Sequence, residues 1–315
     1  MFSHRQNCPG CNGTSRKEVF NTPYTDTLLS EYLSVYYNRA TKAHQKEWLA
    51  NGNFCIAECN ECKLIFQTEI PDDQFMGELY GNWLGVNDPL APHQPQMPIG
   101  YYAYTSAELL QIMAYMKEVG LPEGRPKILD FGMGWSNWAQ IARGFGADVS
   151  GIELSPGKLA HARSLGFRVE ESLASFDARS FDFINTEQVV EHIAEPAKIV
   201  AELVKLLRPN GILKLSVPDG AGIIDVLKNW NWSGAIQRKE QLMPVQPLEH
   251  INCFTAESLD RLAARNGMAR VALPLRIAYS YPADWFDLKS IVKGMLRPVK
   301  RNTLGRGCYA LYRIE

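Results

Sequence analysis

Residues 127–136 read Lys-Ile-Leu-Asp-Phe-Gly-Met-Gly-Trp-Ser. This pattern predicts an apolar strand that ends at Asp130, followed by a loop in which Gly132 and Gly134 allow a sharp turn and a close approach to a ligand. Glu153 ends the next apolar run, about 20 residues after the loop, where a carboxylate can accept hydrogen bonds from both ribose hydroxyls. The spacing predicts a pocket for an adenosyl cofactor.

Two kinds of ligand use a glycine-rich turn after a first strand, namely a dinucleotide and S-adenosylmethionine. A dinucleotide fingerprint requires G-x-G-x-x-G and a helix N-terminus aimed at the pyrophosphate. Here Asp130 opens the motif; it would repel a phosphate but suits the aminoacyl end of a cationic sulfonium cofactor, and Ser136 stands at the third small position. A ligand-free structural turn is the alternative, and the two acids at strand ends argue against it. The sequence therefore favours S-adenosylmethionine.

Three later segments continue this pattern in order. Residues 181–196 place a strand before Val-Val-Glu-His, residues 206–219 hold a Pro-Asn-Gly turn and a strand, and residues 249–259 lead into a late helix. Together these motifs resemble the class I S-adenosylmethionine-dependent methyltransferases, and more closely their bacterial subgroup with the Val-Val-Glu-His motif. The cofactor-binding residues expected on this basis are Asp130, Gly132, Met133, Gly134, Ser136, Glu153, Leu154 and Glu187.

Strand-like and helix-like patterns alternate from Lys127 onward, which predicts a parallel sheet with helices on both faces and ligands at the carboxyl ends of its strands. Strands are expected at 127–131, 148–152, 167–170, 181–185, 211–217, 269–278 and 307–314, and helices at 136–144, 156–165, 196–207 and 255–266. The resemblance implies a Rossmann-like α/β fold with a seven-stranded, mostly parallel sheet. The expected domains are a zinc-binding module at 1–70, a linker and lid helix at 71–126, and a methyltransferase domain at 127–315.

The composition is that of an ordinary globular protein. The chain has 315 residues, 46% of them apolar, and a formal net charge of −1 with both signs dispersed, which argues against nucleic acid as a partner. The N-terminus lacks a signal-peptide core, and no run approaches the ~20 apolar residues of a membrane span, so we expect a cytoplasmic protein without membrane contact. The basic stretch 293–301 is expected to be a solvated loop. The oligomeric state has no signal in the sequence.

Five of the seven cysteines lie in the first 62 residues and include two C-x-x-C pairs, Cys8/Cys11 and Cys59/Cys62. Four thiolates suit a structural tetrahedral zinc ion, because they leave no open position for catalysis. The 47 residues between the pairs exceed the usual spacing of about 15–20, so a helical insert over 28–49 is expected.

A redox dithiol would require a βαβ context that is absent from this part of the sequence. Cys55 competes for a ligand place, although burial is its expected fate. Some methyltransferases that act on nucleotide-linked sugars have a similar module.

The span 71–98 contains many prolines and glycines, which opposes regular structure and favours a linker or an active-site cover. A helix is expected after it, with Ser106 as the N-cap. Three tyrosines before this helix could contact the cofactor carboxylate, with aromatic packing as the alternative: Tyr101, Tyr102 and Tyr104.

Methyl transfer to a hydroxyl or a C–H acid requires a group that removes a proton, and a histidine is the usual choice. His192 follows the fourth strand beside Glu191, and His250 lies in the loop after the fifth, so these three are the catalytic candidates. Structural roles remain open for each: a turn cap for the Glu191–His192 pair and a lid anchor for His250. Some relatives bind a divalent metal with two acids and a histidine here, but Gln188 stands at the first acid, so no such metal is expected. The tryptophans at 230, 232 and 285 could stack on an acceptor or pack in the core.

The sequence therefore predicts an enzyme that transfers a methyl group from S-adenosylmethionine to a small-molecule acceptor, such as a sugar nucleotide, a polysaccharide precursor or a secondary metabolite. Two other classes stay open. One is a non-catalytic cofactor-binding scaffold that uses the zinc module as a contact surface. The other is a nicotinamide oxidoreductase, which Asp130 disfavours.

Overall fold

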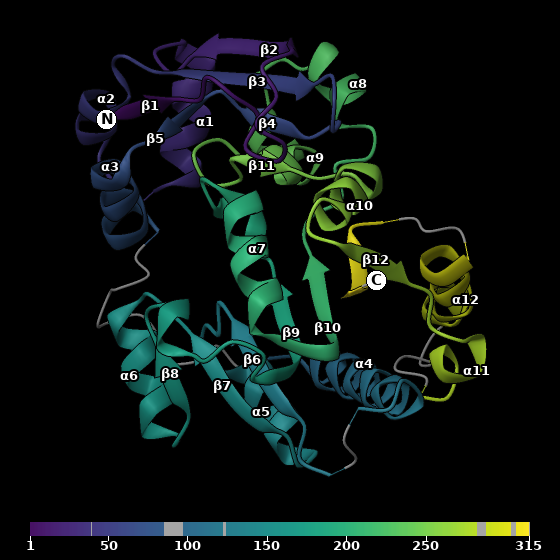
Figure 1. Cartoon of the computed structure of the whole chain (residues 1–315). Helices are drawn as coiled ribbons and strands as arrows, with labels where there is room; N and C mark the ends of the chain where they lie inside the picture. The colour runs from purple at the N-terminus through teal and green to yellow at the C-terminus, as the bar shows by residue number, and fades with distance from the viewer. Residues whose placement is uncertain (39, 85–96, 122–123, 282–287, 304–306, 315) are drawn as a thin grey trace. The chain divides into compact units, whose positions relative to one another are not determined.

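The computed structural model describes residues 1–38, 40–84, 97–121, 124–281, 288–303 and 307–314. These residues divide into two compact units, which we describe separately. The N-terminal unit comprises residues 1–91, 190–197 and 218–262, and the sheet unit comprises residues 92–189, 198–217 and 263–315. Figure 1 follows the chain through both.

The sheet unit is built on one seven-stranded sheet in the part of the chain that the structure describes. Its strands are β6 (Lys127–Phe131), β7 (Asp148–Ile152), β8 (Arg168–Glu170), β9 (Phe181–Glu187), β10 (Leu207–Ser216), β12 (Met268–Val271) and β13 (Tyr309–Ile314). They lie in the order β12-β13-β10-β9-β6-β7-β8. The strands from β10 to β8 are parallel, and β13 is antiparallel to both of its neighbours. The predicted α/β fold with a mostly parallel sheet is therefore confirmed.

Helices cover this sheet because its strands are apolar on both faces. The helices are α4 (Ile99–Glu118), α5 (Asn137–Gly144), α6 (Pro156–Ser164), α11 (Leu275–Ala278), α12 (Leu288–Pro298) and the short η2 (Leu173–Ser175) and η6 (Val299–Thr303), while α7 (Pro196–Leu206) and α10 (Ala256–Ala264) belong partly to each unit. On one face, Ile128 and Phe183 pack with side chains of α4, α5 and α6 in a single core. On the other, Leu129, Ile184 and Leu213 are fully buried.

The N-terminal unit contains two small antiparallel sheets. One has the order β11-β4-β3-β2, from β2 (Arg16–Pro23), β3 (Asn53–Cys59), β4 (Ile65–Gln67) and β11 (Asn252–Cys253); the other pairs β1 (Phe2–His4) with β5 (Glu69–Pro71). Its helices are α1 (Thr27–Tyr36), α2 (Lys42–Leu49), α3 (Asp73–Glu78), α8 (Ile223–Lys228), α9 (Lys239–Leu242) and the short η1 (Leu79–Trp83), η3 (Val190–His192), η4 (Ala235–Arg238) and η5 (Met243–Val245). The expected insert between the cysteine pairs is thus two helices, α1 and α2, rather than one.

An aromatic core holds the N-terminal unit together. The ring of Trp232 contacts Phe20, Tyr32 and Phe54 with centroids 5.4–6.3 Å apart. Trp230 and Trp232 are both buried in this core, so the packing alternative applies to them. Trp285 lies outside the described residues.

The expectation of irregular structure from residue 71 onward is wrong for the first part of that span. The side chain of Asp72 accepts a hydrogen bond from the backbone N–H of Phe75 at 2.9 Å and starts α3. Phe75, Leu79 and Trp83 follow at intervals of four and are buried, so an apolar helical face outweighs the glycines beside it. Residues 85–96 of the span lie outside the described residues.

Three further expectations are corrected. The helix α4 begins at Ile99, directly after Pro98, so Ser106 lies inside the helix and is not its N-cap. The strand expected at 269–278 ends at Val271, because Pro274 cannot continue a ladder of hydrogen bonds, and α11 follows it. The basic stretch 293–301 is helical in α12 and η6 and not a loop.

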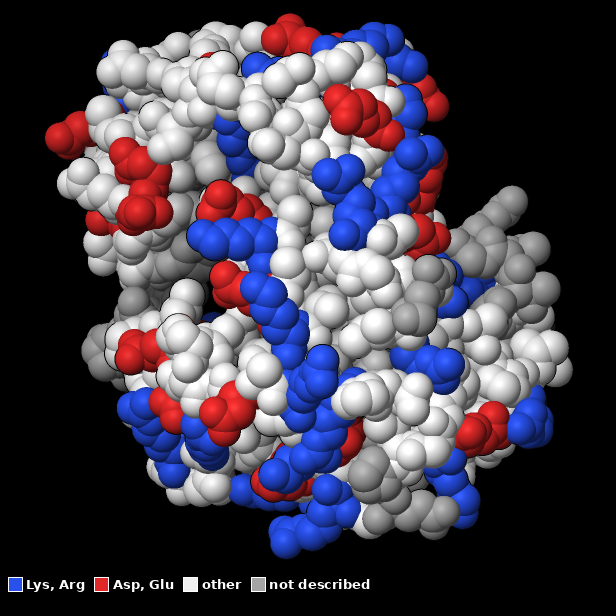
Figure 2. Space-filling model, in the orientation of Figure 1, with Lys and Arg blue, Asp and Glu red and all other residues white. Residues whose placement is uncertain are grey.

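None of the helices among the described residues is long and apolar enough to span a membrane. On the face drawn in Figure 2, acidic and basic side chains are both present.

Candidate metal, cofactor and acid–base sites

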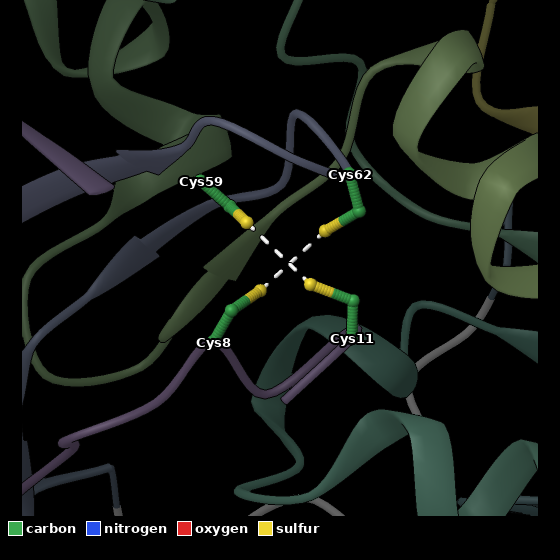
Figure 3. A group of neighbouring side chains, drawn as sticks. All are labelled: Cys8, Cys11, Cys59 and Cys62. Carbon is green, nitrogen blue, oxygen red and sulfur yellow. Dashed lines mark hydrogen bonds between the residues drawn. The ribbon is translucent and has the colours of Figure 1, made fainter. Parts of the chain in front are cut away.

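Four cysteine sulfurs converge in the N-terminal unit. Cys8 and Cys11 lie in the loop after β1, Cys59 ends β3 and Cys62 lies in the turn before β4 (Figure 3). The Sγ atoms of Cys8 and Cys62 are 3.4 Å apart, those of Cys11 and Cys59 are 3.5 Å apart, and all four lie within 4.8 Å of one another. Four Zn–S bonds of about 2.3 Å place tetrahedral sulfurs about 3.8 Å apart, so the thiols fit such an ion.

The two C-x-x-C turns have the same local structure. The residue after each second cysteine has a left-handed backbone, with φ of 62° at both Asn12 and Lys63. Its N–H donates to the carbonyl of the first cysteine, over 2.8 Å to Cys8 and 3.1 Å to Cys59. The backbone N–H groups of Gly10 and Gly13 also point at the sulfurs of Cys8 and Cys11, both at 3.4 Å.

Donors of this kind stabilise thiolates, which are the form that binds metal. The hydrogen bond from Cys8 lowers the pKa of Cys62 to about 5, whereas that same hydrogen bond raises the pKa of Cys8 and burial raises the pKa of Cys11 to about 11. Cys55 is buried in β3, and its sulfur lies 3.4 Å from a carboxylate oxygen of Glu18. It is therefore not one of the four converging thiols.

In the sheet unit, a row of buried polar side chains crosses the middle of the sheet. Asp130 of β6 is in register with Asn185 of β9, and Asn185 is in register with Lys214 of β10. The side-chain amide of Asn185 donates to Asp130 Oδ1 at 2.8 Å. Burial raises the pKa of Asp130 to about 6, although the amide of Asn185 and the charge of Lys214 oppose this shift. The expected aminoacyl-binding acid is thus held at the centre of the sheet.

Glu153 is fixed to the glycine loop. Its Oε2 accepts a hydrogen bond from the N–H of Gly134 at 2.8 Å. Its Oε1 accepts hydrogen bonds from the N–H groups of Leu154 at 2.9 Å and Ser155 at 2.8 Å. A carboxylate has about four acceptor positions, so about one remains for a ribose hydroxyl. Sequence reasoning assigned both ribose hydrogen bonds to Glu153 and did not anticipate this internal use.

The loop between Asp130 and Glu153 is shaped by close packing. Gly132 has a φ of 78°, and a Cβ there would lie 2.4 Å from the side chain of Val189. The side chain of Met133 is buried in the core against Gly151, so a cofactor contact of Met133 would have to come from its backbone. Leu154, by contrast, is 70% exposed beside Glu153 and offers an apolar surface to a purine ring.

Two buried polar atoms of this region lack a partner. The Oγ of Ser136 and the Oδ1 of Asn185 make no hydrogen bond with any residue that the structure describes. Such atoms are costly unless something else satisfies them. The donor and acceptor set therefore fits a polar ligand of the kind that the motif predicts.

Glu187, at the end of β9, belongs to a buried network. Its Oε2 lies 2.5 Å from the Nζ of Lys214, and its Oε1 accepts a hydrogen bond from Ser216 Oγ at 3.0 Å. Lys214 also contacts Glu108 of α4 at 3.0 Å and has no exposed surface. The side chain of Glu187 is 46% exposed, so it joins this network to the surface.

The three catalytic candidates come together in the N-terminal unit. The rings of His192 and His250 meet edge-on with centroids 4.7 Å apart. The Nε2 of His192 lies 3.7 Å from Glu191 Oε1, and one donor atom from each of the three residues lies within 4.8 Å of the others. The same three atoms are close enough to share one cation.

Backbone carbonyls determine which ring nitrogen of each histidine carries the proton. The Nδ1 of His192 lies 3.0 Å from the carbonyl oxygen of Glu249, and the Nδ1 of His250 contacts that of Met243. A carbonyl only accepts, so both Nδ1 atoms donate and both Nε2 atoms keep a lone pair. Burial, followed by the charge of His250, lowers the pKa of His192 to about 4, and burial also lowers the pKa of His250. Both rings are neutral at pH 7 and able to accept a proton.

Sequence reasoning missed two residues of this cluster. The hydroxyl of Tyr80 lies 3.0 Å from His192 Nδ1. The carboxylate of Glu249 accepts a hydrogen bond from Tyr37 at 2.7 Å, and burial raises its pKa. The position of Glu249 directly before His250 was an available signal. Tyr80 had none, because it lies in the span that was expected to be irregular.

Comparisons with known proteins identify the family of the chain. A family model described as a methyltransferase domain matches residues 101–273. A ubiquinone biosynthesis O-methyltransferase of Xanthomonas axonopodis pv. citri (strain 306) is 31% identical over 132 residues, which cover 39% of this chain and 52% of that protein. One from Thiobacillus denitrificans is 33% identical over 100 residues, or 29% of this chain and 43% of that protein. The chain spans about half the length of the curated relatives it matches.

Solved structures of methyltransferases are also similar at low identity. An S-adenosylmethionine-dependent methyltransferase from Mesorhizobium loti has a TM-score of 0.41 and 18% identity, and covers 66% of this chain and 99% of its own. A 1,6-didemethyltoxoflavin N1-methyltransferase of Burkholderia thailandensis has a TM-score of 0.42 and 13% identity, over 81% of this chain and 95% of its own. Since the family model spans more than half of its residues, the chain belongs to the methyltransferase-domain family.

Proposed function

We propose that this chain is an S-adenosylmethionine-dependent methyltransferase that acts on a small-molecule acceptor. One observation carries the proposal: Asp130 is the second-last residue of β6, Glu153 directly follows the adjacent parallel strand β7, and Glu153 accepts a hydrogen bond from the N–H of Gly134 in the loop after β6. The carboxyl ends of parallel strands are where ligands bind in open α/β sheets. The family match supports the same conclusion.

Each of the expected cofactor-binding residues has a proposed task. Asp130 binds the α-ammonium group, held in orientation by Asn185. Glu153 accepts a hydrogen bond from the ribose, and the exposed Leu154 packs on the adenine. Gly132, Gly134, Ser136, the backbone of Met133 and Glu187 complete the set. When bound, S-adenosylmethionine supplies an electrophilic methyl group on a sulfonium ion.

The acid–base cluster supplies the proton acceptor. His192 and His250 are neutral and keep their Nε2 lone pairs, so either can remove a proton from the acceptor as the new bond forms. Glu191 lies 3.7 Å from His192 Nε2 and stabilises the imidazolium that results. The relatives named O-methyltransferases are consistent with an acceptor hydroxyl.

We also propose that the four cysteines hold a structural zinc ion. The sulfur spacing suits a tetrahedral ion, and four thiolates leave no position for a substrate. The ion stabilises the turns that join β1 to β2 and β3 to β4. No nucleic acid partner is proposed, since the net charge is −1.

Calorimetry with S-adenosylmethionine and S-adenosylhomocysteine tests the proposal. We expect both to bind to the wild type, Asp130→Ala to abolish binding, and Asp148→Ala, at an exposed acid that begins β7, to leave it unchanged. Absence of binding at millimolar ligand would overturn the proposal. Binding without transfer of a labelled methyl group to any acceptor in a broad panel would favour the scaffold alternative.

A further inference from the structure

Arg5 stands between β1 and the first cysteine turn of the N-terminal unit, three residues before Cys8. Its Nη1 donates to the carbonyl oxygen of Ile251 at 3.0 Å and to Asn252 Oδ1 at 2.9 Å. Its Nη2 donates to the carbonyl oxygen of Ala194 at 2.9 Å. One guanidinium group therefore joins two segments that are more than 50 residues apart in the chain.

These two segments are the ones that carry the acid–base cluster. Ala194 lies two residues after His192, and Ile251 directly follows His250. Asn252 completes the connection, because its side-chain amide donates to the carbonyl oxygens of Ile193 at 2.7 Å and Val190 at 3.3 Å. Arg5 and Asn252 therefore join these two segments by hydrogen bonds next to the contact between His192 and the carbonyl of Glu249.

The position of Arg5 is itself fixed from the cysteine side. Arg16, at the start of β2, donates to the carbonyl oxygens of Arg5 and Gln6, at 2.6 and 2.9 Å. The N–H of Arg5 donates to Thr68 at 2.8 Å, and the N–H of Cys8 to Gly13 at 2.9 Å. The segment from Arg5 to Cys8 therefore has little freedom once the cysteine turn is closed.

We propose that Arg5 is a positioning residue: together with Asn252 it aligns the segments that carry His192 and His250, and closure of the four-cysteine site holds Arg5 in place. The inference rests on the proposed function only in assigning proton removal to these histidines. It gives the N-terminal cysteine turns a task in the reaction beyond the stability of their own fold.

The chemistry requires arginine at this position. A guanidinium group presents five N–H donors in a rigid plane and can serve acceptors on two segments at once, whereas a lysine ammonium is a single point on a flexible stem. We therefore expect Arg5→Lys to behave like Arg5→Ala. Free guanidinium at millimolar concentration should restore the wild-type histidine tautomers in Arg5→Ala, and sodium chloride at the same ionic strength should not.

The primary test is nitrogen-15 NMR of the histidines in the full chain, because it reads ring tautomers without any acceptor substrate. In the wild type we expect His192 and His250 to be Nδ1-protonated. In Arg5→Ala and in Cys62→Ser, His192 should become a mixture of tautomers, because its acceptor Glu249 lies on the other segment, whereas His250, whose acceptor Met243 lies on its own segment, should stay Nδ1-protonated. Arg261→Ala is the matched control: Arg261 donates to the carbonyl oxygen of Glu61 in the second cysteine turn, and it also donates to the carboxylate of Glu257. It should keep the wild-type spectrum.

A second measurement separates this inference from the proposed function. The dissociation constant for S-adenosylmethionine should stay within about twofold in Arg5→Ala, while kcat on an identified acceptor falls about 10- to 100-fold, the effect of a small misplacement. If Arg5→Ala fails to fold, Arg5→Lys takes its place. Wild-type histidine spectra in the folded variant would overturn the positioning role. Absence of cofactor binding in the wild type would overturn the proposed function and leave this result standing.

Discussion

Asn185 and Asp130 are paired across β9 and β6: the side-chain amide of Asn185 donates to the carboxylate of Asp130 at 2.8 Å, with both residues buried. The amide has two consequences. It fixes the direction of the carboxylate, and it limits the rise in pKa that burial alone would cause. Asp130 is thereby left with a pKa of about 6.

Cofactor binding should therefore weaken in mild acid. If Asp130 binds the α-ammonium group as proposed, its ionised form attracts the cofactor and its protonated form does not, so affinity should be full above pH 7 and fall as the pH drops through about 6. If only the ionised form binds, the apparent dissociation constant at pH 5 is about tenfold higher than at pH 7. Calorimetry with S-adenosylhomocysteine from pH 5 to 8 measures this change.

Folding stability should show the opposite trend for this residue. The folded pKa of Asp130 is raised, so its contribution to the stability is present at low pH and is lost as the pH rises through about 6.

Asp130→Asn should remove the pH dependence of binding together with most of the affinity, whereas Asp148→Asn should retain both. A pH-independent affinity in the wild type would contradict this role of Asp130.

Removal of the Glu153 carboxylate should affect the loop as well as the ribose. Glu153→Ala leaves the N–H groups of Gly134, Leu154 and Ser155 without their acceptor, at a cost of about 1–3 kcal/mol in unfolding free energy. Glu153→Gln keeps one acceptor oxygen and should lose less stability. Chemical denaturation and calorimetry together measure both effects. If Glu153→Ala binds the cofactor more weakly but keeps the stability of the wild type, the hydrogen bonds from the loop to Glu153 contribute little to the unfolding free energy.

The first motif could be read from the sequence because its physics is local. An apolar run that ends at Asp130, two glycines and a second run that ends at Glu153 define strands β6 and β7, both with the predicted bounds. The four cysteines could be grouped for the same reason, since each C-x-x-C pair is a single turn. The mainly parallel sheet follows from the alternation of strand and helix patterns.

The residues that were missed depend on pairing between distant segments. Nothing near Lys214 in the sequence shows that it faces Glu108, which lies 106 residues earlier in another element. Likewise, β11 pairs with β4 across nearly 190 residues and brings His250 into the N-terminal unit. Tyr80 was hidden by neighbouring glycines, whose unfavourable propensity is outweighed by the burial of Leu79 and Trp83.

The cysteine turns should depend on bound zinc. Elemental analysis of the purified chain is expected to give about one zinc per chain, and Cys62→Ser should lose the metal and unfold at lower temperature, because binding free energy is folding free energy in such sites. Cys55→Ser is the matched control, since Cys55 is buried in β3 and lies apart from the four sulfurs. A wild type that contains no metal and melts at the same temperature as Cys62→Ser would contradict the assignment.

Replacement of His250 should separate binding from chemistry. His250→Asn keeps a polar group in place but removes the Nε2 lone pair, so if His250 and not His192 removes the proton of the acceptor, kcat should fall by about 10²–10⁴-fold. Cofactor affinity should be retained, because all of the expected cofactor residues belong to the sheet unit and His250 belongs to the N-terminal unit. If elemental analysis shows a second metal equivalent that His250→Asn removes, the cluster with Glu191 and His192 is a cation site and not a base.

The Glu108–Lys214–Glu187 network makes a prediction about stability. Lys214 has no exposed surface, and its charge lowers the pKa of Glu108 against the raising effect of burial. Lys214→Met keeps the volume but removes the cation that lies 3.0 Å from the buried carboxylate of Glu108, which should cost about 3–5 kcal/mol in unfolding free energy. Adding Glu108→Gln should recover most of the loss, because the uncompensated charge is gone. Lys205→Met, at an exposed site in α7, should change stability by less than about 0.5 kcal/mol.

Denaturant unfolding followed by tryptophan fluorescence suits this comparison, since Trp138 donates to Glu108 and reports on the same site. Equal destabilisation in the single and double variants would show that the lysine acts through packing and not through its charge.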